Sequence, residues 1–171
     1  LMRPFDEDEQ QERLDAIPGV GHDVAQVILA ELGVDMSRFP SAAHAASWAG
    51  LAPGKNESAG KNRSGKITPG NRHLKTALIQ AAHAASRTRD NYLAAQFRRL
   101  AARRGKKRAA VAVAHSILVI AYHMLRNGTE YYELGGDYFD KRNKAQLQRN
   151  LVKRLEGLGL QVTLEPVAVV A

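Results

Sequence analysis

The sequence predicts an all-α protein, and three observations support this fold class. Apolar residues recur at helical spacing in several segments, most clearly between residues 109 and 125. Aromatic residues make up only 6% of a chain that is 44% hydrophobic, so the core must consist mainly of Ala, Leu, Val and Ile, which suits closely packed helices. No segment favours an extended sheet. A length of 171 residues predicts one or two small domains.

The first part of the chain contains three predicted helices. A polar, acidic helix is expected over residues 6–15 and is broken by the run Ile17–Gly21. The next helix covers residues 22–32, where apolar side chains follow a helical spacing, and Gly33 is its natural stop. Ser41 can cap a short Ala-rich helix that ends at Gly50.

A long glycine-rich and proline-rich loop is expected over residues 51–70, with room for a short hairpin. At about 20 residues it is too long for a plain connector, and such loops in compact domains are usually functional or disordered. Thr68 and Pro69 can begin the following helix, as a cap and a first-turn proline.

The second part of the chain continues the helical pattern. Helices are expected over residues 71–86, from residue 92 to a stop at Gly105, and over 109–125 with a stop at Asn127-Gly128. A last, polar helix is expected over residues 140–157, and residues 160–171 look strand-like or frayed.

Charge is strongly segregated along the chain, whose formal net charge is +8 and whose isoelectric point is near 10.0. Residues 1–15 hold six acids and two bases, whereas residues 86–108 hold nine bases and a single acid, Asp90. A segregated basic block favours a polyanionic partner through counterion release. The absence of cysteine excludes disulfides, thiol catalysis and cysteine-ligated zinc. No signal peptide or membrane-spanning run is evident, so no membrane partner is expected.

The run Ile17–Gly21 followed by a helix resembles the helix-hairpin-helix of DNA-binding proteins that do not read sequence. Gly19 and Gly21 allow a tight turn through which backbone can approach a phosphate, while Val20 anchors the turn in the core. The free N–H groups at the start of the next helix would then face the anion. An ordinary glycine turn between helices is the alternative. Base-excision glycosylases also carry this hairpin, but Asp35, the only acid near their catalytic spacing, stands in a different local sequence.

Four segments carry a more specific resemblance, and they lie at Trp48–Pro53, Glu57–Lys61, Ser64–Thr68 and Gly70–Lys75. Together with the preceding hairpin, they resemble the carboxy-terminal domain of the DEDD-type insertion-sequence transposases, the bridge-RNA-guided serine recombinases. In that family the helix-hairpin-helix comes first, and a Gly-Leu-x-Pro stretch, a Ser-Gly-type loop and a Gly-Asn/Asp-x-x-Leu-Arg/Lys helix start follow it. All four elements occur here in that order. The similarity covers residues 14–128, divided into a hairpin segment 14–33, a serine loop 51–70 and helices 71–127. Residues 129–171 form a carboxy-terminal helical extension and tail.

The resemblance implies that Ser58 is the nucleophile that attacks the scissile phosphate. Ala59 separates Ser58 from Gly60, a departure from the common Ser-Gly pair, and this leaves Ser64, directly followed by Gly65, as the alternative. A serine hydroxyl needs a base or metal to activate it, and the phosphoryl oxygens need positive charge around them. Bases surround the loop, with Glu57 as its only acid, at Lys55, Lys61, Arg63, Lys66, Arg72 and Lys75. Without the resemblance, Ser58 would be read as an ordinary solvated serine.

The resemblance also implies what this chain lacks. The family's four metal-binding carboxylates lie in an amino-terminal domain, so residues 1–13 are interpreted as a linker or helix from a missing catalytic domain. No cofactor is expected here, and Mg²⁺ is implied only for the missing domain. The acids Glu130, Glu133, Asp137 and Asp140 are read as a solvated edge rather than a metal cluster. The chain alone is therefore expected to be catalytically inactive.

A basic block is predicted to contact nucleic-acid phosphates, and it consists of Arg103, Arg104, Lys106, Lys107 and Arg108. Bases suit the end of a helix, but Lys106 to Arg108 oppose the dipole at the start of the next one, which hints at an external anion. A solubilising patch is the alternative. None of the six histidines are four residues apart, so no helical zinc pair exists. His115 and His123 are interpreted as packing residues and His73 as a candidate general base for Ser58.

These observations predict a DNA-binding, serine-bearing domain of an insertion-sequence transposase that cuts and rejoins DNA. Expected partners are DNA, a guide RNA and further copies of the chain, in the cytoplasm of a bacterium and associated with the nucleoid. Two alternatives are a non-catalytic helix-hairpin-helix DNA-binding module and a structural dimerisation domain in which the helix at 109–125 pairs between chains.

Overall fold

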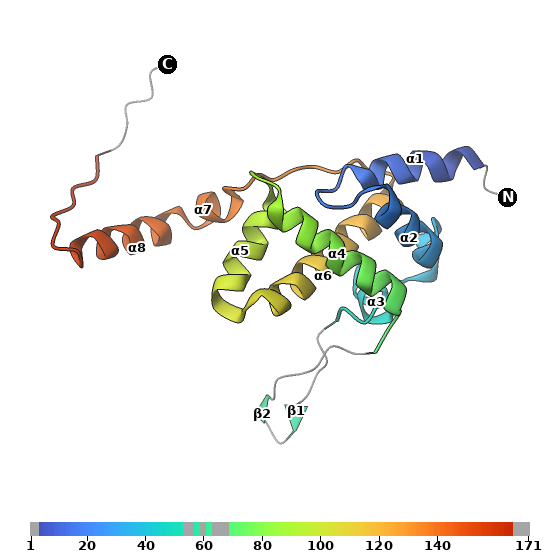
Figure 1. Cartoon of the computed structure of the whole chain (residues 1–171), viewed down its shortest axis with the longest axis horizontal. Coiled ribbons are helices and arrows are strands. Elements are labelled where there is room, and N and C mark those ends of the chain that lie inside the picture. The colour runs from blue at the N-terminus through green and yellow to red at the C-terminus, as the bar shows by residue number, and fades with distance from the viewer. Residues whose placement is uncertain (1–3, 53–56, 59–60, 63–68, 166–171) are drawn as a thin grey trace, which may run out of the picture.

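The computed structural model describes residues 4–52, 57–58, 61–62 and 69–165 and is all-α, as predicted (Figure 1). One 3-10 helix and one two-stranded antiparallel hairpin accompany the α-helices in this part of the chain. The bounds are α1 Pro4–Asp15, α2 His22–Leu32, η1 Met36–Arg38, α3 Ala42–Trp48, β1 Glu57–Ser58, β2 Lys61–Asn62, α4 Arg72–Arg87, α5 Tyr92–Arg104, α6 Lys106–Asn127, α7 Tyr138–Arg142 and α8 Lys144–Glu156.

Helix α6 forms the centre of the bundle and packs against α3, α4 and α5. Its predicted apolar stripe is buried in full, at Ala114, Ile117, Leu118, Ala121, Met124 and Leu125. Tyr122 is also completely buried, and its hydroxyl donates a hydrogen bond of 2.8 Å to the carbonyl of Phe39. Helix α6 is long and apolar enough to cross a membrane by composition, but its apolar side chains face the other helices of this fold.

The turn between α1 and α2 packs against α4 by direct backbone contact. Gly19 has a φ of +85°, and a Cβ atom added to it would lie 2.3 Å from the carbonyl oxygen of Ala81. Val20 is buried at 2% exposure, which confirms its predicted role as an anchor. Small side chains on the facing surface of α4, Ala81 and Ala85, allow this approach.

The predicted helix starts need two corrections. Ser41 stands at the N-cap of α3, but its hydroxyl contacts the ring nitrogen Nδ1 of His44 at 2.8 Å instead of capping a backbone N–H. The cap of α4 was misplaced, because the helix begins one residue after Asn71 and not at Pro69. Asn71 is the cap, since its side chain accepts the N–H of Leu74 and also donates to Glu31 on α2, while Thr68 lies outside the described residues.

The predicted carboxy-terminal helix over residues 140–157 is two helices, α7 and α8, separated at Asn143. Asn143 leaves the helical region with a φ of −119° and a ψ of 34°. Helix α7 is fixed by aromatic packing on α5, while α8 buries none of its residues and lies away from the bundle (Figure 1). Only α7 is therefore held by packing against the bundle. Residues 160–165 follow α8 and form neither helix nor strand.

We predict that Gly19→Ala lowers the free energy of unfolding by about 2 to 4 kcal/mol, because the new Cβ meets the backbone of α4 at a positive φ. Chemical denaturation followed by circular dichroism measures this loss. Gly21→Ala is the matched control, since its φ is −87° and nothing lies within 4 Å of its added Cβ. We expect this control to cost less than about 1 kcal/mol, and equal losses for the two variants would contradict the packing role of Gly19.

Candidate nucleic-acid interface

The two ends of the serine loop meet at a contact between two glycine backbones. A Cβ atom at Gly70 would lie 2.2 Å from the amide nitrogen of Gly50 and 2.5 Å from its Cα. The amide of Asn71 donates to the carbonyl of Trp48 at 3.1 Å, and the amide of Leu51 donates to that of Ala46 at 2.9 Å. Because Leu51 is buried at 2% exposure, the base of the loop is anchored in the core.

Asn71 connects this base to two helices, a role that the sequence interpretation missed. Its Oδ1 accepts the backbone N–H of Leu74 at 3.0 Å, which caps α4. Its Nδ2 donates to the carboxylate of Glu31 on α2, 40 residues earlier in the chain. The position of asparagine just before a helical apolar pattern was the signal that could have identified the cap.

Ser58, the predicted nucleophile, lies in strand β1, whose backbone pairs with β2 so that Ser58 faces Lys61 in register and Glu57 faces Asn62. Figure 1 shows this hairpin apart from the helices, beyond the ends of α3 and α4. The backbone of Ser58 is therefore not enclosed in the helical bundle. The alternative nucleophile Ser64 lies outside the described residues, as do the predicted cations Lys55, Arg63 and Lys66.

Cations follow the loop directly, in the first turn of α4. Arg72 is exposed and Lys75 is half-buried, and this turn contains no acidic residue. Positive charges at a helix start oppose the helix dipole, so their arrangement favours an external anion. His73, the candidate general base, is exposed beside them. Its role toward Ser58 stays a prediction.

The helix-hairpin-helix turn has the predicted shape but a mixed electrostatic environment. Gly21 is the N-cap residue of α2 and has open space around it, which leaves the first N–H groups accessible. Gly19, by contrast, approaches α4 rather than the outside. Asp23 lies in the first turn of α2, and acids of α1 line a hollow beside His22. These carboxylates oppose a phosphate, so phosphate binding at Gly19 and Gly21 stays a prediction.

The basic block lies at the corner between α5 and α6, where Gly105 turns the chain with a φ of +83°. All five of its cations are exposed, at Arg103, Arg104, Lys106, Lys107 and Arg108. Within the described part of the chain, none of them has an ion pair within 4.0 Å. Five uncompensated charges around one corner create a positive potential that attracts a polyanion.

Two of the acids after α6 form hydrogen bonds or an ion pair within the chain. Glu133 accepts hydrogen bonds from the amide of Tyr92 at 2.7 Å and from the hydroxyl of Tyr131 at 2.8 Å. Asp137 forms an ion pair of 2.7 Å with Lys141. Among the described residues, no three His, Cys, Asp or Glu side chains lie together as ligands for a metal ion.

His115, His123 and Asp35 differ in how well their surroundings fit the predicted roles. His115 is half-buried, and burial lowers its pKa, which fits the predicted packing role. The same prediction is wrong for His123, which is exposed and contacts the edge of the Tyr122 ring. Asp35 accepts hydrogen bonds from the amide and hydroxyl of Ser37, and these bonds lower its pKa. This cap of η1 accounts for Asp35 without a glycosylase role.

Comparison with known proteins decides the family. A sequence model of the IS116/IS110/IS902 transposase family matches residues 11–98, half of the chain. The chain belongs to this transposase family. The matched segment contains the hairpin turn, the serine loop, α4 and the start of α5.

Two curated relatives extend the similarity beyond the family match. One is the insertion element IS110 uncharacterized 43.6 kDa protein of Streptomyces coelicolor, 37% identical over 120 residues, or 69% of this chain and 29% of the relative. The other is the putative transposase y4pF/y4sB of Sinorhizobium fredii, 33% identical over 141 residues, or 80% of this chain and 36% of the relative. The matched regions thus span about a third of the length of these relatives.

We predict that Asn71→Ala lowers the free energy of unfolding by about 1 to 2 kcal/mol, because it removes the cap of α4 and leaves Glu31 without its donor. Asn71→Asp is the matched variant, since it keeps the acceptor for Leu74 but places a carboxylate against Glu31. We expect Asn71→Asp to lose stability at neutral pH, where the two carboxylates repel each other, and to recover it in acid. Denaturation curves at pH 4 and 7 measure both effects, and a pH-independent difference from the parent would contradict the contact with Glu31.

Proposed function

We propose that this chain is the nucleic-acid-binding and serine-bearing part of an insertion-sequence transposase, which cuts and rejoins DNA. The observation that carries the proposal is the anchored loop of this transposase family member. Its base is closed by Gly50 against Gly70, and its far segment, with Ser58, lies away from the helices. A rigid base with a hairpin apart from the helical bundle suits a loop that presents a side chain to a large substrate.

The chemistry that suits this loop is a phosphoryl transfer through serine. The Ser58 hydroxyl loses its proton to a base, and its oxygen attacks the scissile phosphorus. A new serine–phosphorus bond forms while the bond to one deoxyribose oxygen breaks, and that oxygen takes up a proton. A deoxyribose hydroxyl of the second DNA end then attacks the phosphoserine and restores the serine. The number of phosphodiester bonds is unchanged, so rejoining needs no external energy.

The cations near the loop would serve this transfer. Arg72 and Lys75 begin the helix that follows the loop, where a bound phosphate would offset their unfavourable position against the helix dipole. His73 lies between them and is the candidate acceptor for the serine proton. The implied Mg²⁺ belongs in this proposal to a part of the transposase outside this chain, and we expect the chain alone to be inactive.

The fold disfavours one of the two alternative functions, the dimerisation domain, and leaves support for the other, the non-catalytic DNA-binding module. Pairing between chains through residues 109–125 is disfavoured, because the apolar stripe of α6 is already buried by α3, α4 and α5 of the same chain. A non-catalytic DNA-binding module keeps its support from the basic block and the hairpin turn. Binding of a guide RNA and assembly into oligomers stay predictions.

We predict that Ser58→Ala abolishes transposition by the full-length transposase, with at least a thousandfold loss (about 4 kcal/mol in the barrier), while DNA binding persists. A plasmid transposition assay and a mobility-shift assay measure the two quantities. Ser64→Ala is the matched control in the same loop. If Ser64→Ala is inactive and Ser58→Ala is active, the nucleophile is Ser64, and full activity of both variants favours the non-catalytic module.

We predict that replacing Lys106, Lys107 and Arg108 with Ala weakens duplex-DNA binding and flattens its salt dependence. The slope of log K against log salt should fall by up to about 2.7, or about 0.9 for each lost phosphate contact. Fluorescence anisotropy at several salt concentrations measures the slope. Replacing Lys144, Lys153 and Arg154 on α8 with Ala removes the same charge elsewhere. An equal loss of DNA affinity in both triple variants would mean that the basic block contributes only through the net charge of the chain.

A further inference from the structure

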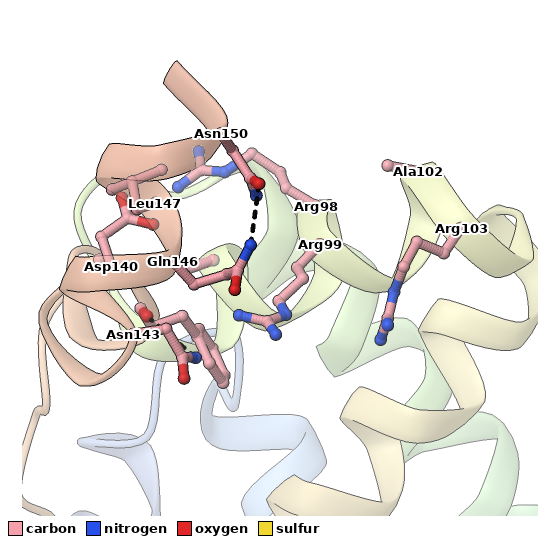
Figure 2. Close-up of a pocket in the computed structure, with 12 residues that line it drawn as sticks. Arg98, Arg99, Ala102, Arg103, Asp140, Asn143, Gln146, Leu147 and Asn150 are labelled. Carbon is pink, nitrogen blue, oxygen red and sulfur yellow. Dashed lines mark hydrogen bonds between the residues drawn. The ribbon is translucent and has the colours of Figure 1, made fainter. Parts of the chain in front are cut away.

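A cleft of about 660 Å³ lies between α5 and the α7–α8 segment, outside the serine loop (Figure 2). Arg98, Arg99 and Arg103 line it from α5, and Asn143 and Asn150 line it from the opposite wall. A second hollow of about 350 Å³ shares Arg99, Arg103 and Asn143 with the first and is also lined by Arg142. The two hollows form one concave surface with cations and side-chain amides on its walls.

The α7 part of the far wall of this cleft is held in place by specific contacts. Glu133 accepts hydrogen bonds from the backbone amide of Tyr92 at the start of α5 and from that of Gly135 just before α7, each at 2.7 Å. The ring of Phe139 stacks on that of Tyr92 with a centroid distance of 5.2 Å and an angle of 22°. These contacts join α7 to α5, so the part of the cleft between these two helices is fixed by the fold.

The cations in the cleft lack acidic partners in the described part of the chain. None of Arg98, Arg99, Arg103 and Arg142 has an ion pair within 4.0 Å there, although Asp140 also lines the cleft. The guanidinium carbon of Arg99 lies 5.2 Å from the centre of the Phe139 ring, which orients this side chain. Figure 2 shows Arg98 and Arg99 extending from α5 toward the wall formed by α7 and α8.

The amides provide a different kind of contact. Gln146 donates to Asn150 at 2.9 Å and accepts from Arg149 at 3.0 Å, so neighbouring polar groups orient it. Side-chain amides of Asn and Gln offer a donor and an acceptor together, as the edges of nucleobases do. The cleft therefore combines groups that bind phosphate with groups that can pair with a base edge.

We propose that this cleft binds an unpaired segment of nucleic acid, with its phosphates on the arginines and a base edge at Asn143 and Asn150. A duplex hides its pairing edges and presents a convex row of phosphates, so it cannot place a base in a concave cleft. Arg103 belongs both to the cleft and to the basic block, which gives the strand a continuous cationic path. The inference rests on the proposed nucleic-acid function and adds a single-strand site to it.

The test measures binding of the chain to labelled oligomers of about ten nucleotides, as single-stranded DNA, single-stranded RNA and duplex DNA of one sequence. Arg98→Ala combined with Arg99→Ala should weaken single-strand binding by about tenfold and lower its salt slope by about 1.4, or about 0.7 for each phosphate contact. Duplex binding should change less. The double variant Lys153→Ala with Arg154→Ala removes equal charge from exposed positions of α8 outside this cleft and is the matched control.

A second variant keeps the charge and tests the base contacts. Asn143→Ala with Asn150→Ala should weaken single-strand binding while leaving the salt slope unchanged. Stronger binding of RNA would identify an RNA as the occupant, and stronger binding of DNA would identify a displaced DNA strand. Circular dichroism of each variant verifies that the helices are intact.

Three results would overturn the proposal. The first is an equal loss of affinity in the Arg98→Ala/Arg99→Ala variant and in the Lys153→Ala/Arg154→Ala control. The second is an equal loss for single strands and duplex, and the third is displacement of the oligomer by polyglutamate at the same charge concentration, which would indicate an acidic protein segment. Failure of the proposed function is separate, because it would leave transposition intact in Ser58→Ala while single-strand binding still depended on Arg98 and Arg99.

Discussion

The fold depends on close backbone contact at helix α4, where glycine is the residue that permits it. On one side, Gly19 brings the turn between α1 and α2 against the carbonyl of Ala81. At the amino-terminal end of α4, Gly70, the residue before the cap, packs against the backbone of Gly50. Both contacts join segments far apart in sequence without an intervening side chain. Since α4 also packs on the central helix α6, they fix the hairpin turn and the loop base relative to one core.

The same contacts set the position from which the long loop leaves the domain. Its two ends are held by Leu51 in the core and by Asn71 between Glu31 and Leu74. The hairpin that carries Ser58 lies apart from the helices (Figure 1).

The helical core could be predicted from the sequence, and the features that required distant contacts could not. The apolar faces of α4 and α6 were read correctly, because burial on one side of a helix imposes a local period. The cap at Asn71 was missed because part of its advantage comes from Glu31, which is remote in sequence. The split at Asn143 and the cleft beside it arise from the docking of Phe139 on Tyr92, which no local pattern records.

The positive charge of the chain is placed where the fold itself does not compensate it. Lys106 to Arg108 stand at the start of α6 and Arg72 at the start of α4, in both cases without an acid in the first turn. Arg98 and Arg99 face the α7–α8 segment rather than a carboxylate partner in the described residues. Stability alone favours pairing such charges or placing them at the carboxy-terminal ends of helices. Their presence at three separate places supports the proposal of a polyanionic partner.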